Sequence, residues 1–260
     1  MNPAIQQPFD VRLMNITATV MFTACGVVLL AALMWWLVRN PVFAIGAITV
    51  QGDVTHNSQS TLRANVTPRL AGNFFTVSLQ RTREAFESVP WVRQAVVRRE
   101  FPNRLRVLLQ EHQAVALWGA DSDLKMVNSF GEVFEANTGD VEQDNLPHLK
   151  GPEGQSVQVL EMFRAIQPMF EPMELAVEQL TLTAHGSWNA TLDSGAVIEL
   201  GRGNVDEVKA RLGRFVQTLT QVTSRYGRRA EAVVSADLRH GDGYAVRLRG
   251  VSTEAEAQKR

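Results

Sequence analysis

Residues 78–109 read SLQRTREAFESVPWVRQAVVRREFPNRLRVLL, and within this segment the hydrophobic period changes from that of a helix to that of a strand. Between Ser78 and Pro90, apolar side chains recur every three or four residues, which predicts an amphipathic helix that Ser78 caps and Pro90 ends. After Pro90, residues 91–101 are rich in β-branched residues and arginine. After the turn Pro102-Asn103, Leu105, Val107 and Leu109 alternate with Arg104, Arg106 and Leu108. The segment therefore predicts a helix followed by a β-hairpin.

The residues before this segment complete a small domain. Residues 44–50 predict a short strand, and a helix is predicted between Ser58, which caps it, and Pro68, which limits it. The predicted order over residues 43–111 is therefore strand, helix, helix, strand, strand.

Residues 112–250 predict a second domain that is richer in strands. Its short candidate strands are residues 114–118, 125–128, 132–134, 176–184, 188–192 and 196–200. One of its two predicted helices carries an apolar stripe of Val159, Phe163, Ile166 and Phe170. The other runs from Val205 to Tyr226, with Asn204 and Glu207 as a capping box and Gly227 as the C′ residue. It has too few heptads for a coiled coil, so we expect it to pack against a sheet.

A hairpin is predicted to close the fold on either side of residues 240–243. The residues that alternate along its strands are Ala232, Val234, Ala236 and Leu238, and then Tyr244, Val246 and Leu248. A final strand is often the edge of its sheet, where unpaired backbone groups can bind a strand from a partner. Residues 251–260 are polar and are predicted to form a disordered tail.

The longest uncharged run in the chain extends from Leu13 to Val38 and is mostly apolar. A run of this length crosses a hydrocarbon core of about 30 Å, so it predicts a membrane anchor. It is too long for the apolar part of a signal peptide. Near its end lie Trp35 and Trp36, which suit the membrane interface better than a cleavage site. The flanking charges do not decide the orientation of the anchor.

Composition argues against several classes of protein. The 26 basic and 27 acidic residues nearly balance, and no basic run is interleaved with aromatic residues, which argues against nucleic acid as a partner. Cys25 is the single cysteine and lies in the predicted anchor, so the rest of the chain has no thiol for a disulfide or zinc cluster. The histidines show no metal-ligand spacing, and no nucleophile or phosphate-loop motif occurs. The sequence predicts a binding protein that is not an enzyme and has no cofactor or metal site.

Several short motifs occur together along the chain. They are GNFFTV at 72–77, PWVR at 90–93, RREFPNRL at 98–105, EH at 111–112, LGR at 200–202 and DLR at 237–239. With the order of predicted elements, this set resembles the FtsQ/DivIB family of bacterial cell-division proteins, and the first domain resembles a POTRA domain. The implied fold class is α+β, with a cytoplasmic tail (1–12), a transmembrane helix (13–38), a β-α-α-β-β POTRA domain (43–111), a β-rich domain with two helices (112–250) and a disordered tail (251–260).

The resemblance also implies partners and a location. Members of the family are scaffolds that link early and late divisome proteins and bind FtsB, or the FtsB/FtsL complex, through the C-terminal strand region. The POTRA domain is implied to bind FtsK and other divisome proteins, and self-association is a further expectation. Such proteins are embedded in the cell inner membrane by a single pass, with the N-terminus in the cytoplasm and the C-terminal domains in the periplasm, concentrated at the septum.

By position in the LGR and DLR motifs, the resemblance assigns partner binding to eleven residues. They are Arg202, Asp237, Leu238, Arg239, His240, Gly241, Gly243, Tyr244, Ala245, Val246 and Arg247. Many relatives have an aromatic residue after DLR where this chain has His240, so Tyr244 is the expected aromatic anchor. Two other classes are alternatives. A POTRA-containing component of a translocation or secretion system would normally carry a barrel or repeated POTRA units, and a membrane-anchored hydrolase would need a reactive cluster.

Overall fold

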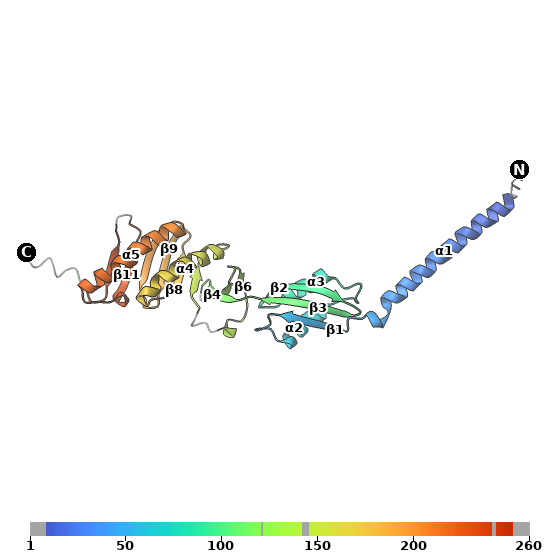
Figure 1. The fold of residues 1–260 in the computed structure, drawn as a ribbon, viewed down its shortest axis with the longest axis horizontal. Helices are drawn as coiled ribbons and strands as arrows, with labels where there is room; N and C mark the ends of the chain where they lie inside the picture. The colour runs from blue at the N-terminus through green and yellow to red at the C-terminus, as the bar shows by residue number, and fades with distance from the viewer. Residues whose placement is uncertain (1–8, 121, 142–145, 241–242, 252–260) are drawn as a thin grey trace, which may run out of the picture. The chain divides into compact units, whose positions relative to one another are not determined.

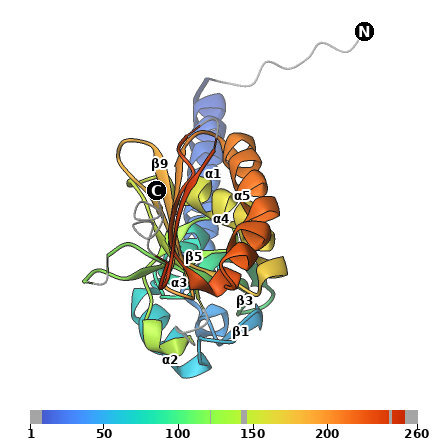
Figure 2. The same cartoon turned by 90° about the vertical axis from the view of Figure 1, so that its left-hand side faces the viewer.

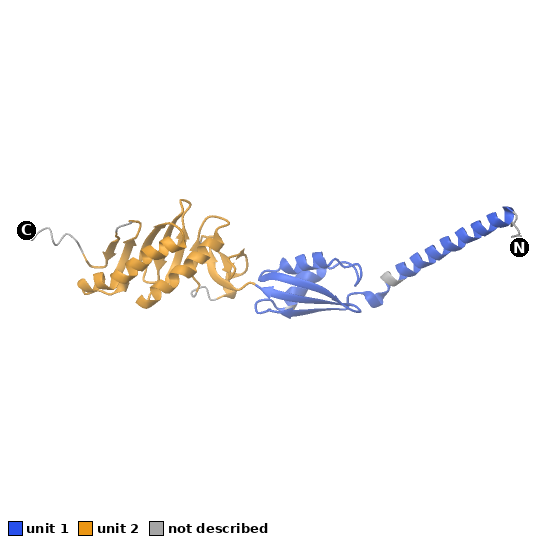
Figure 3. Ribbon diagram, turned by 45° about the horizontal axis from the view of Figure 1, so that its top comes forward, with its two compact units in different colours: residues 1–111 blue, residues 112–260 orange. Residues whose placement is uncertain are grey.

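The computed structural model describes residues 9–120, 122–141, 146–240 and 243–251. The chain divides into two compact units, residues 1–111 and 112–260 (Figures 1 and 3). The first contains a long helix and a small sheet with two helices, and the second contains a larger sheet with two helices. The predicted α+β fold is confirmed.

Helix α1 (Phe9–Arg39) begins four residues before the expected start of the anchor at Leu13. It is long and apolar enough to cross a membrane. Leu13, Trp35 and Trp36 are exposed on its surface, and only the backbone of Val38 is described. Of the expected N-terminal tail, residues 1–8 lie outside the described part of the chain.

The sheet of the first unit has the strand order β1-β3-β2. Its strands are β1 (Ala47–Gly52), β2 (Val92–Glu100) and β3 (Arg104–Glu111), with β1 parallel and β2 antiparallel to β3. The helices are α2 (Gln59–Val66) and α3 (Leu79–Glu87), and the short 3-10 helices are η1 (Pro41–Phe43) and η2 (Thr67–Arg69). The predicted strand–helix–helix–strand–strand order is confirmed, but the first strand begins at Ala47 rather than Ala44.

The core of the first unit lies between the sheet and its helices. Alternate residues of β3, Leu105, Val107 and Leu109, are buried, and Phe86 of α3 packs in the same core as Val107 and Leu109. Ser58 and Ser78 cap α2 and α3, each accepting a hydrogen bond from a backbone N–H of the first turn. The apolar side chains that recur with helical spacing in α3 and with alternate spacing in β3 therefore pack together in one apolar layer.

The second unit contains a nine-stranded mixed sheet. Its strands are β4 (Ala114–Trp118), β5 (Lys125–Asn128), β6 (Val133–Phe134), β7 (His148–Lys150), β8 (Val177–Leu182), β9 (Ser187–Leu192), β10 (Val197–Arg202), β11 (Val233–Asp237) and β12 (Ala245–Leu248). Their order across the sheet is β12-β11-β10-β9-β8-β7-β4-β5-β6. Short 3-10 helices occur at η3 (Thr138–Asp140), η5 (Glu171–Met173) and η6 (Ala230–Ala232).

Helices α4 (Ser156–Phe170) and α5 (Val205–Arg225) lie side by side on one face of this sheet (Figures 1 and 2). The core beneath them includes Trp188, Phe170 and Phe215, each at most 1% exposed. Burying a side chain of this kind contributes roughly 1.5–3 kcal/mol, so the helix–sheet interface is a major source of stability for this unit. The prediction that the second helix packs against a sheet is confirmed.

Three local predictions for the second unit were incomplete or wrong. Strand β7 was not predicted, because a three-residue strand gives no alternation to read. In β11 the register shifts between Val233 and Ser235, and this bulge moves Val233 into the core in place of the predicted Val234. Tyr226 was predicted on the core face of α5 but follows its end and is 56% exposed.

The capping predictions for α5 are confirmed. The Asn204 side chain accepts from the backbone N–H of Glu207, and the Glu207 carboxylate accepts from the backbone N–H of Asn204, which completes a capping box. Gly227 has φ +62°, a left-handed conformation that suits the C′ position. Both ends of this helix could therefore be read from the sequence.

Candidate partner-binding edge

Strand β12 lies at one end of the nine-stranded sheet, and among the described residues it pairs only with β11. The backbone N–H of Arg249, just after β12, donates to Ala232 O at 2.8 Å, on the β11 side. In an antiparallel strand this direction alternates, so Arg247 faces β11 in the same way and the N–H of Val246 faces outward. β12 thus presents backbone groups that could accept a further strand.

Asp237 and Arg239 form a brace at the end of β11. Arg239 donates from Nε to Asp237 Oδ1 at 2.9 Å and from Nη2 to Asp237 Oδ2 at 2.6 Å, while Glu199 Oε2 of β10 lies 3.0 Å from the same Nε. These hydrogen bonds from Arg239 lower the pKa of Asp237 to about 2. The Arg239 guanidinium is therefore bound within the chain to one carboxylate of β11 and one of β10.

The pH dependence of this brace follows from the lowered pKa. A carboxylate whose folded-state pKa lies below its ordinary value of 3.8 stabilises the fold fully above that value and loses this contribution as the pH falls toward about 2. We expect an NMR titration of the Asp237 carboxyl to show no change above about pH 5 and a midpoint near 2. In the Arg239→Gln variant the midpoint should move back toward 3.8; an unchanged midpoint would show that Arg239 does not hold the carboxylate.

The ring of Tyr244 packs against α5 rather than standing free. It meets Phe215 edge to face, with ring centroids 5.0 Å apart, and its hydroxyl lies 2.7 Å from Thr218 Oγ1. Tyr244 and Val246 pack against the core on the helix side of the sheet, whereas Ala245 and Arg247 are exposed. Tyr244 is therefore partly buried in its own domain, and only the rest of its ring could contact a partner as the predicted aromatic anchor.

Removing only the Tyr244 hydroxyl should have a modest effect. Tyr244→Phe keeps the contact with Phe215 but loses the hydrogen bond with Thr218, so we expect the free energy of unfolding to fall by about 0.5–1.5 kcal/mol. Thr218→Val removes the same bond and also the bond from Thr218 Oγ1 to Arg214 O, so its own loss can be larger, but adding Tyr244→Phe to it should cost little more. Urea unfolding of the variants measures this; fully additive losses would show that the bond is not made.

A groove of about 260 Å³ lies between α5 and the end of β11. Its lining residues are Arg211, Arg214, Gln217 and Thr218 of α5 and Leu238, His240, Gly243 and Tyr244 of the closing hairpin. None of the lining residues is acidic and two are arginines, while Asp237 Oδ2 lies 4.0 Å from His240 Nε2. The sequence reading missed the α5 residues, although Arg211, Arg214 and Thr218 follow one another at helical spacing on the polar side of that helix.

Arg202 is linked to this groove through Arg211. Arg211 donates from Nε to Leu200 O at 3.0 Å and from Nη2 to the backbone carbonyl of Arg202. The end of β10 is thus fixed against α5, and the side chain of Arg202 is exposed there. Leu238 also lines this groove, although its side chain is 2% exposed and belongs to the core. Gly241 lies outside the described residues.

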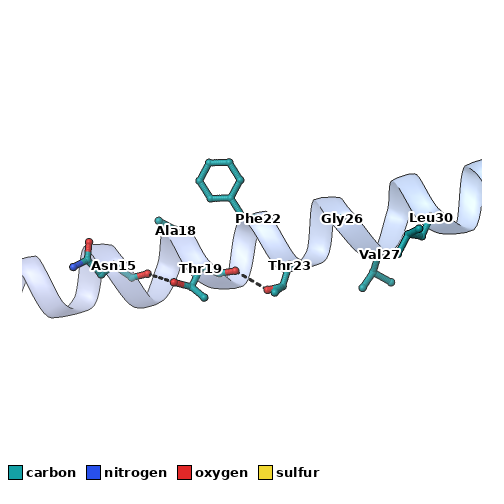
Figure 4. Close-up of a pocket in the computed structure, with 8 residues that line it drawn as sticks. All are labelled: Asn15, Ala18, Thr19, Phe22, Thr23, Gly26, Val27 and Leu30. Atoms are coloured by element: carbon teal, nitrogen blue, oxygen red, sulfur yellow. Dashed lines mark hydrogen bonds between the residues drawn. The ribbon is translucent and has the colours of Figure 1, made fainter.

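A hollow along α1 is larger but has no features of a site (Figure 4). It is lined by Asn15, Ala18, Thr19, Phe22, Thr23, Gly26, Val27 and Leu30. Thr19 donates to Asn15 O at 2.7 Å and Thr23 donates to Thr19 O at 2.6 Å, so these hydroxyls are satisfied within the helix. The hollow is only the space between side chains on the surface of one helix. No group of three or more potential metal ligands occurs in the described parts of either unit.

The architecture defines a class of protein, in which a single apolar helix is followed by a small β-α-α-β-β domain and a larger β-rich domain. Residues 43–112 match the family model described as "POTRA domain, FtsQ-type", and residues 116–239 match "Cell division protein FtsQ/DivIB, C-terminal". The second match ends just before β12.

Curated proteins named Cell division protein FtsQ are similar to this chain over nearly its whole length. The chain is 39% identical to Cell division protein FtsQ of Burkholderia pseudomallei over 251 residues, which cover 96% of this chain and 98% of the relative. It is 39% identical to that of Thiomonas arsenitoxydans over 94% of this chain and 89% of the relative, and 37% identical to that of Bordetella pertussis over 92% of both. The chain belongs to the FtsQ/DivIB family of cell division proteins, and its apolar α1 identifies it as a single-pass membrane protein.

Proposed function

We propose that this chain is a non-enzymatic divisome scaffold that captures the FtsB/FtsL complex at the β12 edge of its β domain. The observation that supports this most directly is the outer side of β12, which has no partner strand in the described chain and lies beside the groove of Arg211 and Arg214. The family assignment favours this function over a translocation or secretion component, the alternative that the sequence left open.

The mechanism follows from the chemistry of a sheet edge. A strand from the partner adds to β12 by main-chain hydrogen bonds, which supply affinity, while side chains on either side of it supply specificity. On the helix side of β12 the partner meets the groove, where Arg214 and His240 would bind an acidic side chain. On the other side it meets the exposed Ala245 and Arg247. The bound complex would then be held at the division site.

The remaining parts of the proposal concern location and other partners. With the N-terminus in the cytoplasm, α1 would hold both domains in the periplasm at the inner membrane, concentrated at the septum. The POTRA domain would dock FtsK and other divisome proteins, and it would also offer a surface for self-association. Membrane attachment limits diffusion to two dimensions and raises the effective concentration of each partner for the others.

The test is photo-crosslinking in dividing cells, with the reactive side chain in place of Arg247. This position is better than Tyr244, whose ring packs on Phe215, because Arg247 is exposed beside the edge. We expect FtsB to be captured from Arg247 and not from Leu108, which is 53% exposed in the other domain. Capture of only a secretion component, or of no FtsB, would overturn the proposed function.

A further inference from the structure

Three segments of the POTRA domain meet at the end where the chain leaves α1. The backbone N–H of Phe74 donates to Phe43 O at 2.9 Å, and the N–H of Gly46 donates to Asn103 O at 2.9 Å. These bonds join the η1 segment, the loop at 72–77 and the turn between β2 and β3. The apolar residues they bring together, here called the aromatic pole, are Val42, Phe43, Phe74, Phe75 and Phe101.

The rings of the aromatic pole are in contact, yet much of their surface is exposed. Phe75 lies 4.9 Å from Phe43 and 5.3 Å from Phe74, and Phe101 lies 6.2 Å from Phe74, measured between ring centroids. Phe74 is 8% exposed, whereas Phe75, Val42 and Phe101 are 47%, 61% and 76% exposed. Contiguous exposed apolar side chains are typical of surfaces that contact a protein or a membrane.

The loop that presents Phe75 is held in place by polar contacts. Asn73 Oδ1 accepts from the backbone N–H of Phe75 at 3.0 Å and of Thr76 at 3.1 Å. Arg99 of β2 donates from Nε to Phe74 O at 2.8 Å and from Nη2 to Val77 O at 2.8 Å. Because the loop is fixed before it binds anything, little conformational entropy is lost when Phe75 is covered.

The chain itself shows what lies next to this surface. Helix α1 ends at Arg39, and three residues span at most about 10 Å, so Val42 stays near the membrane surface whichever way the domain turns. The headgroup layer on each side of the hydrocarbon core is about 5–8 Å thick, which is within that reach. Arg104 is exposed at the same pole, opposite Ala47 and Glu100 in the sheet, and it adds a cation that anionic lipids favour.

We propose that the aromatic pole binds the bilayer surface, with Phe75 and Phe101 at the boundary between headgroups and acyl chains. Each contact is weak, but the tether to α1 makes the binding intramolecular, so weak contacts are sufficient. The consequence is that the POTRA domain has a preferred orientation on the membrane instead of turning freely on the linker. This inference depends on α1 as a membrane span and not on the partner proposed for β12.

The experiment uses the full chain in liposomes of zwitterionic and anionic lipids. Cys25→Ser removes the single native cysteine, and an environment-sensitive fluorophore is attached at Phe101→Cys or, as the control, at Thr55→Cys. Thr55 is exposed and follows β1 at the opposite end of the domain, where Asp53 bonds to Leu109. We expect lipids that carry a quencher near the headgroup to quench the Phe101 site severalfold more than the Thr55 site.

A second substitution tests the aromatic pole itself. Adding Phe75→Ser should reduce quenching at the Phe101 site, whereas Leu108→Ser, at an exposed position on the middle of β3, should leave it unchanged. Equal quenching at the Phe101 and Thr55 sites would overturn the proposal. The proposal would also be overturned if the fluorophore at the Phe101 site were shielded from water but not quenched by the lipid quencher. If that shielding disappears on dilution of the protein, a second copy of the chain covers the aromatic pole instead.

Discussion

Replacing Val246 by proline is expected to lower capture of the FtsB/FtsL complex at least about tenfold, which corresponds to about 1.4 kcal/mol. The N–H of Val246 faces away from β11, so proline removes a donor that only an added strand would use. Proline is tolerated on an edge strand when its nitrogen faces solvent, and the β domain should therefore stay folded. Binding of the purified full chain to the FtsB/FtsL complex measures the effect.

Two matched variants separate the backbone effect from side-chain packing. Val246→Ala keeps the N–H and trims the side chain that packs on the core, so it should bind much better than Val246→Pro. Arg247→Pro puts the same ring one residue later, where the N–H faces β11, and should loosen the closing hairpin itself. Equal capture by Val246→Pro and Val246→Ala would rule out strand addition at β12. No binding by the unchanged chain would instead refute the choice of partner.

The sequence predicted most of the fold because its helices and strands have clear periods and caps. The α5 helix is an example: its capping box at Asn204 and its C′ glycine at Gly227 are both present. What it could not predict was non-local. The bulge in β11 depends on how β12 pairs with it, and β7 exists as a strand only because β4 and β8 lie on either side of it. Neither feature leaves a local pattern.

At the candidate edge, too, the sequence predicted the local element but not its contacts with distant parts of the chain. The sequence placed the closing hairpin at the end of the fold, and the structure has β12 as the end strand of the sheet. It could not show that the ring of Tyr244 would pack on Phe215, or that Arg211 and Arg214 would line a groove beside it, because α5 and the hairpin are distant in the chain. Their proximity results from helix–sheet packing, which only the folded chain reveals.

Replacing Glu111 by alanine is expected to destabilise the POTRA domain by about 3 kcal/mol, because several hydrogen bonds to a buried carboxyl group are lost together. The side chain is 2% exposed. Its Oε1 accepts from the backbone N–H and the side-chain amide of Asn57, at 3.0 and 2.8 Å, and its Oε2 accepts from the backbone N–H of His56 at 2.9 Å. Alanine would leave these donors without a partner, and Asn57 is itself buried.

The position of Glu111 explains why its loss should destabilise segments on both sides of it. His56 stacks on Trp91 with ring centroids 3.9 Å apart, and Trp91 is buried with φ +72°, a backbone conformation that a non-glycine residue holds only when its surroundings support it. Glu111, at the end of β3, therefore fixes the segment before α2 and, through His56, supports the start of β2. Loss of the carboxyl group should loosen both.

Hydrogen exchange on the full chain measures this effect domain by domain, which avoids assuming that both domains unfold together. A loss of about 3 kcal/mol corresponds to roughly a hundredfold faster exchange for the most protected amides of β3, since each 1.4 kcal/mol is tenfold. Glu111→Gln retains one acceptor oxygen for Asn57 but turns an amide donor toward His56, so its effect should be intermediate. Amides of β8 in the other domain serve as the internal control. Exchange in β3 that stays within a few-fold of the unchanged chain would mean that Glu111 does not hold this end of the domain together.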